Sequence, residues 1–193
     1  MSVREPNGDQ VRILAFDPGL SITGYACLSA GPGREVSLIE AGSIDLSPGA
    51  GEAGDSEAAR WGPRLVELGR DVERLIGSSA ATHAAVEAVF AHREHPRAAI
   101  AMAHARGVIL RQLALAGLPV VELSAASVKK SVTGSGRASK DQVARAVSLR
   151  LGLGALPEPR DVSDAIAIGL AAAQRIPAGV RGGSGHPGGR AER

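Results

Sequence analysis

Four acidic residues stand at the ends of predicted strands or at the start of a predicted helix: Asp17, Glu87, Asp161 and Asp164. Asp17 follows an apolar run and precedes a Pro-Gly turn, and Glu87 lies near the end of a second apolar run. Asp161 and Asp164 are three residues apart, so they share one face of a helix. If the two apolar runs form neighbouring parallel strands, Asp17 and Glu87 meet at the sheet edge where ligands bind in open α/β sheets. The helix can aim its two acids at one point.

Carboxylates that converge in this way cannot all stay charged without a cation among them. Oxygen ligands favour Mg²⁺ or Mn²⁺ over zinc, and the sequence lacks the cluster of Cys and His residues that zinc prefers. Two such ions about 4 Å apart would activate a water molecule and stabilise the leaving oxygen of a phosphodiester. The predicted chemistry is therefore hydrolysis without a covalent intermediate.

Each acid also has a purely structural interpretation. Asp17 could begin a turn and accept hydrogen bonds from the backbone of residues 19–20. Asp161 and Asp164 could serve as the N-cap and the N3 residue of a helix. Glu87 could pair with an arginine. Together these interpretations explain the convergence of the four acids less well than a metal site does.

Hydrophobic periodicity predicts how these acids are positioned. The early strands are joined by short turns, as in an antiparallel meander, and the later strands alternate with helices. This order predicts an α/β fold with a mixed sheet flanked by helices. The predicted strands are 11–16, 24–29, 35–44, 83–90 and 119–123, and the predicted helices are 57–76, 96–116, 124–132, 139–151 and 161–175.

Positive charge is concentrated between residues 93 and 150, although the formal net charge of the whole chain is only +2. All lysines of the chain, Lys129, Lys130 and Lys140, fall within this region. Such a basic face could bind phosphate groups, and the clustered lysines indicate a local demand for compact, mobile ammonium groups. The alternative is a solvated loop that merely carries charge.

The 193 residues predict one domain with a buried core. We expect residues 1–10 to be disordered, 11–176 to form the domain and 177–193 to be a flexible tail rich in Gly and Arg. Cys27 is the single cysteine, which favours a reducing compartment. With no signal peptide and no apolar run that could span a bilayer, the predicted location is cytoplasmic, without a membrane partner.

Five segments together resemble the RuvC family of Holliday-junction resolvases, the crossover junction endodeoxyribonucleases of the RNase H-like superfamily. The resemblance covers roughly residues 11–175, in order and at compatible spacing. The segments are Ile-Leu-Ala-Phe-Asp-Pro-Gly-Leu-Ser-Ile-Thr-Gly-Tyr (13–25), Val-Glu-Ala-Val-Phe (86–90), Ala-Arg-Gly-Val (105–108), Val-Lys-Lys-Ser-Val-Thr-Gly (128–134) and Asp-Val-Ser-Asp-Ala-Ile-Ala-Ile (161–168).

The resemblance implies an RNase H-like fold and a homodimer that introduces paired symmetric nicks into four-way DNA junctions, in recombination and repair. It implies Mg²⁺ as the cofactor, with Mn²⁺ able to substitute and two ions in each active site. A further implied partner is the RuvA–RuvB branch-migration complex. The implied catalytic and metal-binding residues are Asp17, Glu87, Asp161 and Asp164. The expected DNA-binding residues are Phe90, which would wedge into the junction, Lys129, Lys130, Arg137 and Lys140.

Two segments depart from the family pattern. Residues 91–97 look about one residue longer than is usual and lack an expected Asn, and the Gly-rich segment 46–56 differs from the usual connection. Three alternatives therefore stay open at this point. The protein could be a nuclease-inactive binding module of the same fold, or a nuclease for other branched or RNA-containing substrates. An actin-like kinase or ATPase would need a second domain and a second phosphate loop, for which this chain is too short.

Overall fold

The computed structural model describes residues 10–33, 35–47, 56–88 and 96–177. The predicted elements are all present, and their bounds agree closely with the sequence pattern. The strands are β1 (Val11–Asp17), β2 (Ile22–Ala30), β3 (Val36–Asp45), β4 (His83–Glu87) and β5 (Val120–Leu123), and the helices are α1 (Glu57–Ser79), α2 (Pro96–Leu115), α3 (Ala125–Thr133), α4 (Lys140–Leu151) and α5 (Arg160–Ala173).

The strands form one mixed sheet in the order β3-β2-β1-β4-β5. β1, β2 and β3 are antiparallel neighbours, which confirms the predicted meander. β4 pairs in parallel with β1, and β5 pairs in parallel with β4. The carboxyl ends of β1 and β4 therefore lie side by side, as the two acids at their ends require.

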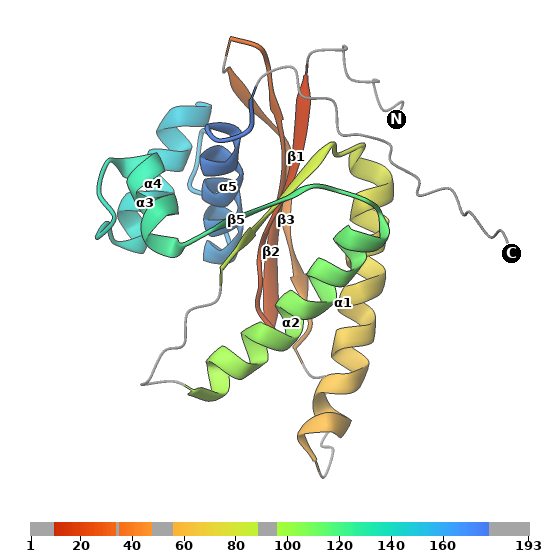
Figure 1. Ribbon diagram of the computed structural model, residues 1–193. Coiled ribbons are helices and arrows are strands. Elements are labelled where there is room, and N and C mark those ends of the chain that lie inside the picture. The colour runs from red at the N-terminus through yellow and green to blue at the C-terminus, as the bar shows by residue number, and fades with distance from the viewer. Residues whose placement is uncertain (1–9, 34, 48–55, 89–95, 178–193) are drawn as a thin grey trace, which may run out of the picture.

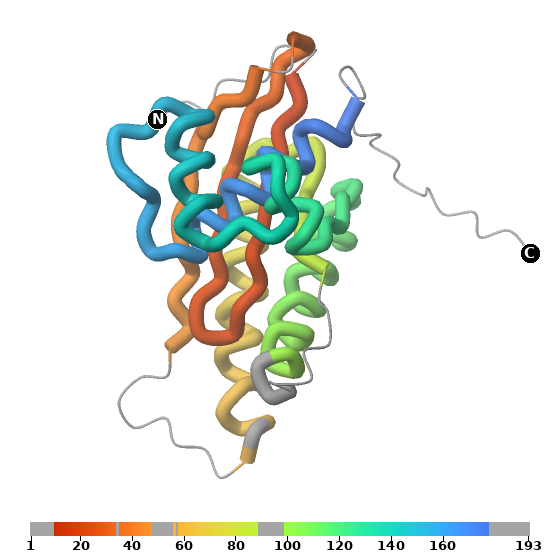
Figure 2. The backbone as a smooth tube through the Cα atoms, turned by 90° about the vertical axis from the view of Figure 1, so that its left-hand side faces the viewer, coloured from red at the N-terminus to blue at the C-terminus, as the bar shows by residue number. Residues whose placement is uncertain are grey.

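Helices cover both faces of this sheet (Figure 1). α1 and α2 pack on one face, while α3, α4 and α5 lie on the other, where α5 crosses in front of the strands in Figure 2. The apolar run in β1 serves both layers because successive side chains point to opposite faces. Ile13 and Ala15 are buried with α5, and Leu14 and Phe16 are buried with α1 and α2.

α5 lies unusually close to the sheet because glycines stand at two contact points. A Cβ atom on Gly169 would lie 2.2 Å from Leu28 Cδ1, and one on Gly24 would lie 2.1 Å from the carbonyl oxygen of Asp161. Small residues thus set how near the first turn of α5, with its two acids, approaches the strands.

One predicted boundary, the start of α4, has a clear local cause, and one predicted boundary, the end of β4, differs from the structure. Ser139 caps α4 through the predicted capping box, in which its side chain accepts from Gln142 N and the Gln142 side chain accepts from Ser139 N. β4 ends at Glu87 rather than at residue 90, and residues 89–90 lie outside the described part of the chain.

Among the helices of the described ranges, none is long and apolar enough to cross a membrane.

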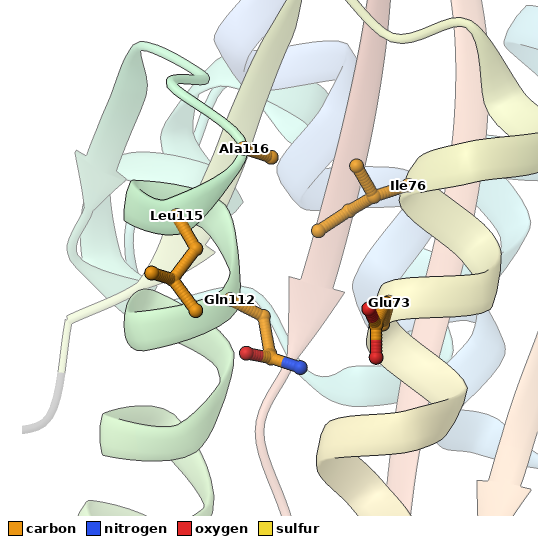
Figure 3. Close-up of a pocket in the computed structure, with 5 residues that line it drawn as sticks. All are labelled: Glu73, Ile76, Gln112, Leu115 and Ala116. Carbon is orange, nitrogen blue, oxygen red and sulfur yellow. The ribbon is translucent and has the colours of Figure 1, made fainter.

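A small cavity of about 180 Å³ lies between α1 and α2, on the sheet face opposite α5. Figure 3 shows Glu73 and Ile76 on α1 facing Gln112 and Leu115 on α2. Gln112 Nε2 donates to the carbonyl oxygen of Gly69 at 2.8 Å, so this side chain joins the two helices. None of the four predicted catalytic acids lines this cavity, which fits a packing gap between helices.

Candidate active site

One pocket of about 430 Å³ brings together all four predicted acids. It opens at the carboxyl ends of β1 and β4 and is bounded by α2, α3, α4 and α5. The side chains that line it and could do chemistry are Asp17, Glu87, Lys129, Lys140, Asp161 and Asp164. Residues from five separate elements and nearly 150 positions of sequence therefore meet at one site, as the predicted parallel pairing of β1 and β4 requires.

Asp17 is the last residue of β1 and is held by its strand partner Gly24 on β2. The turn that follows is closed by Thr23, whose hydroxyl donates to the Gly19 carbonyl oxygen at 2.6 Å and accepts from Gly19 N at 3.2 Å. Arg64 of α1 donates to the Leu20 carbonyl oxygen at 2.6 Å and so fixes the same turn from outside. The backbone beyond Asp17 is thus rigid, which fixes the direction of its side chain.

Asp17 and Glu87 form a close carboxyl pair that shares a hydrogen bond. The pKa of Asp17 is raised to about 8, chiefly by burial and then by the nearby Glu87 and Asp164 carboxylates, while Lys140 opposes the rise. The pKa of Glu87 is also raised, chiefly by burial. Near neutral pH, Asp17 therefore keeps its proton unless a cation takes the place of that proton.

Asp161 and Asp164 lie in the first turns of α5 and reach the pocket from the opposite side. Lys140, the first residue of α4, places Nζ 2.8 Å from Asp164 Oδ2. This hydrogen bond raises the pKa of Lys140, so its ammonium group stays charged. A second ion pair, between Arg160 and Asp141 at 3.1 Å, joins the starts of the same two helices.

The structure contradicts the structural interpretations of three acids. The N-cap of α5 is Pro159, without a side-chain cap, so Asp161 does not cap the helix. Gly19 N donates to Thr23 rather than to Asp17. Within the described residues Glu87 forms no ion pair with an arginine, since Arg106 donates to its backbone carbonyl oxygen instead.

The predicted DNA-binding residues lie in different parts of the structure. Lys129 and Lys140 line the pocket with the acids. Arg137 instead lines an open pocket of about 620 Å³ formed by α3, α4 and the loop between them, together with Arg145. Lys130 is exposed on α3 and lines neither pocket. Phe90, the predicted wedge, lies outside the described residues.

Sequence reasoning missed several residues that shape this site. Met102 of α2 forms part of the pocket wall, and only the helical spacing of α2 could have suggested that it faces inward. Gly24 admits the first turn of α5, as its position in the first resemblance segment could have signalled. Arg106, within the Ala-Arg-Gly-Val segment, contacts the backbone of Glu87.

The donor set fits hard divalent cations in its chemistry, because all four acids offer carboxylate oxygens. Four carboxylates line one pocket, and the pKa of Asp17 is raised first by burial and then by the neighbouring carboxylates. In their present rotamers no three acidic, His or Cys side chains of the described ranges are gathered closely enough to hold an ion.

Comparison with known proteins agrees with the fold and identifies the family. Residues 13–172 match the family described as crossover junction endodeoxyribonuclease RuvC. A relative of that name from Rhodopirellula baltica is 42% identical over 162 residues, which cover 82% of this chain and 83% of the relative. RuvC of Thermus thermophilus, solved alone and in complex with a Holliday junction substrate, superposes with a TM-score of 0.70 at 25% identity, covering 83% of this chain and 92% of that one. The chain therefore belongs to the RuvC family of crossover junction endodeoxyribonucleases.

Proposed function

We propose that this protein is a metal-dependent endonuclease that resolves four-way DNA junctions by paired symmetric nicks. The observation that carries the proposal is the single pocket lined by Asp17, Glu87, Asp161 and Asp164. Membership of the RuvC family supports the reaction class, and a related RuvC has been solved with a Holliday junction substrate.

We assign the four acids to binding Mg²⁺, with Mn²⁺ as a substitute and two ions in each site. When bound, the ions would activate the attacking water and stabilise the leaving oxygen. The protein's own contribution is to hold these carboxylates on β1, β4 and α5, elements that are packed into the core. Because Asp17 has a raised pKa, it must lose its proton before it can act as a ligand, so cation binding competes with protons.

The two lysines of the pocket supply positive charge for the phosphate. Lys140 is 59% exposed, so it can contact both Asp164 and a phosphate oxygen from the open side. Lys129 lines the same pocket from α3. We assign both to binding the phosphate that is cut, where a fixed cation favours the charge that develops on its oxygens. Lys130 and Arg137, which lie outside this pocket, are assigned to other contacts with the junction DNA, and Phe90 is assigned to wedging into the junction.

A homodimer fits this reaction, because two strands of like sequence must be cut at symmetric positions. Two active sites related by a two-fold axis would meet this requirement. We further propose that the dimer acts with the RuvA–RuvB branch-migration complex, as the family resemblance implies.

A nuclease-inactive binding module is the weaker candidate. A surface that only binds DNA gains nothing from four carboxylates in one pocket, because they repel phosphates. Burial of the Asp17–Glu87 pair also costs free energy that a binding surface could avoid with neutral residues.

The test is incubation of the purified full chain with a labelled four-way junction, a matched linear duplex and an RNA-containing duplex, each with Mg²⁺ and with EDTA. Symmetric nicks in the junction alone, lost with EDTA, are the expected result. Tight junction binding without nicks under Mg²⁺ and Mn²⁺ would favour the binding module, and preferential cutting of the RNA-containing duplex would assign a different substrate.

A further inference from the structure

Arg106 lies on α2 beside the end of the strand that carries Glu87. Its Nε donates to the Glu87 backbone carbonyl oxygen at 3.2 Å, and its guanidinium also pairs with the Glu122 carboxylate on β5. The Arg106 side chain is only 19% exposed, so it is enclosed between the helix and the sheet. One side chain thus joins α2 to two adjacent parallel strands.

The site of this contact is where the regular sheet pairing stops. The last pair between β1 and β4 joins Phe16 to Val86, one residue before the two acids. On the other side, Ala88 N donates to the Leu123 carbonyl oxygen at 2.8 Å. The carbonyl group of Glu87 therefore lies beyond the β1–β4 pairing, and Arg106 satisfies it.

Neighbouring residues fix the direction of Arg106. Ala105 and Ile109 on the same helix are fully buried in the core between α2 and the sheet. They anchor the turn from which Arg106 extends, so the guanidinium has little freedom to move. Arginine suits this place because its planar group can donate to two acceptors at once, whereas a lysine ammonium is a single point.

We propose that Arg106 is a positioning residue, which holds the end of β4 so that the Glu87 carboxylate faces Asp17 across the pocket. The inference rests on the proposed function of that pocket. It gives a physical role to the Ala-Arg-Gly-Val segment, which the four acids alone leave unexplained. Arg106 acts through the backbone of Glu87 and lies outside the set of residues that line the pocket.

The test compares the full-length wild type with Arg106→Met and Arg106→Lys. Three quantities are measured: Mn²⁺ affinity without DNA by electron paramagnetic resonance, junction affinity in EDTA, and the single-turnover rate of nicking. Arg74→Met is the matched control, because Arg74 also pairs with an acid but is 75% exposed on α1. Thermal unfolding of every variant reports whether it is folded.

We expect Arg106→Met to weaken Mn²⁺ binding and to slow nicking by about tenfold or more, since small displacements of catalytic groups have large effects on rate. Junction affinity in EDTA should not change, and Arg74→Met should match the wild type in all three measurements. Arg106→Lys should fall between the wild type and Arg106→Met, because a lysine can satisfy only one of the two acceptors on β4 and β5.

Wild-type Mn²⁺ affinity in both Arg106 variants would overturn the proposal, as would a loss of nicking that merely follows a loss of junction affinity. If Arg106→Met does not fold, Arg106→Lys decides the matter, and its equality with the wild type would overturn the proposal. A wild type that binds Mn²⁺ but makes no nicks would contradict the proposed function instead, while the Mn²⁺ comparison would still decide the role of Arg106.

Discussion

Gly24→Ala should strongly slow nicking, although it changes none of the side chains that line the active site. Gly24 pairs with Asp17 in the sheet and lies under the first turn of α5. A Cβ atom at this position would lie 2.1 Å from the Asp161 carbonyl oxygen, whereas real Cβ contacts essentially never fall below 3.0 Å. The added Cβ atom is fixed to the backbone of β2, and the nearest atoms that it meets belong to the backbone of α5. Neither group can rotate away, so β2 and α5 must separate by about 1 Å to make room.

That separation moves Asp161 directly and Asp164 with it, because both lie near the start of the same helix. A displacement of about 1 Å in a catalytic group lowers rates by roughly 100-fold. Overpacking of this kind costs about 1–3 kcal/mol of folding free energy, which a folded domain can tolerate. We therefore expect a folded protein that binds junctions and nicks them about 100-fold more slowly.

The assay is single-turnover nicking of a labelled four-way junction, with junction binding in EDTA and urea unfolding measured alongside. Gly77→Ala on α1 is the matched control, because a Cβ atom there would meet no atom within 4 Å. Replacing a glycine with an alanine within a helix should stabilise the protein by about 0.5–1 kcal/mol, and this change should leave nicking unchanged. A folded Gly24→Ala protein that nicks at the wild-type rate would refute the reasoning.

Three further predictions follow from the site. Without metal, Asp17 holds a proton in the native state but not in the unfolded chain between the ordinary Asp pKa of 3.8 and about 8, so its contribution to the free energy of unfolding in EDTA should fall as pH rises through this window. Asp17→Asn should flatten that dependence in urea titrations, and an unchanged slope would contradict the assigned pKa. Lys140→Met removes the partner of Asp164 and should slow nicking by about 100-fold in a single-turnover assay; a wild-type rate would remove Lys140 from the site. Ser139→Ala removes the side-chain cap of α4 and should lower the free energy of unfolding by about 1 kcal/mol, as measured in urea. An unchanged free energy of unfolding would show that the Gln142 side chain alone is enough to cap the helix.

The sequence predicted the sheet well because its signals are local. Apolar alternation and short turns identified the meander, and the helix between β3 and β4 required a parallel crossover that brings Asp17 beside Glu87. The capping box of α4 was equally visible, since Ser139 and Gln142 are three residues apart. These features depend on short-range spacing, which a sequence displays directly.

The rest depends on contacts between distant segments. No spacing rule indicates that Gly24 faces the backbone of Asp161, or that Arg106 reaches the carbonyl oxygen of Glu87. The Lys140–Asp164 pair was likewise hidden, because acid and base come from different helices. Such contacts depend on the angle and depth at which a helix packs, and small residues decide both.

The central claim is that the four carboxylates of one pocket carry out the cleavage of a junction. Its most direct test is Asp17→Asn, compared with the wild type for junction binding in EDTA and for nicking with Mg²⁺. The amide keeps the shape of the side chain but removes the charge that a cation requires. The account predicts unchanged or tighter junction binding and no detectable nicks. Nicking at the wild-type rate by a folded Asp17→Asn protein would contradict it.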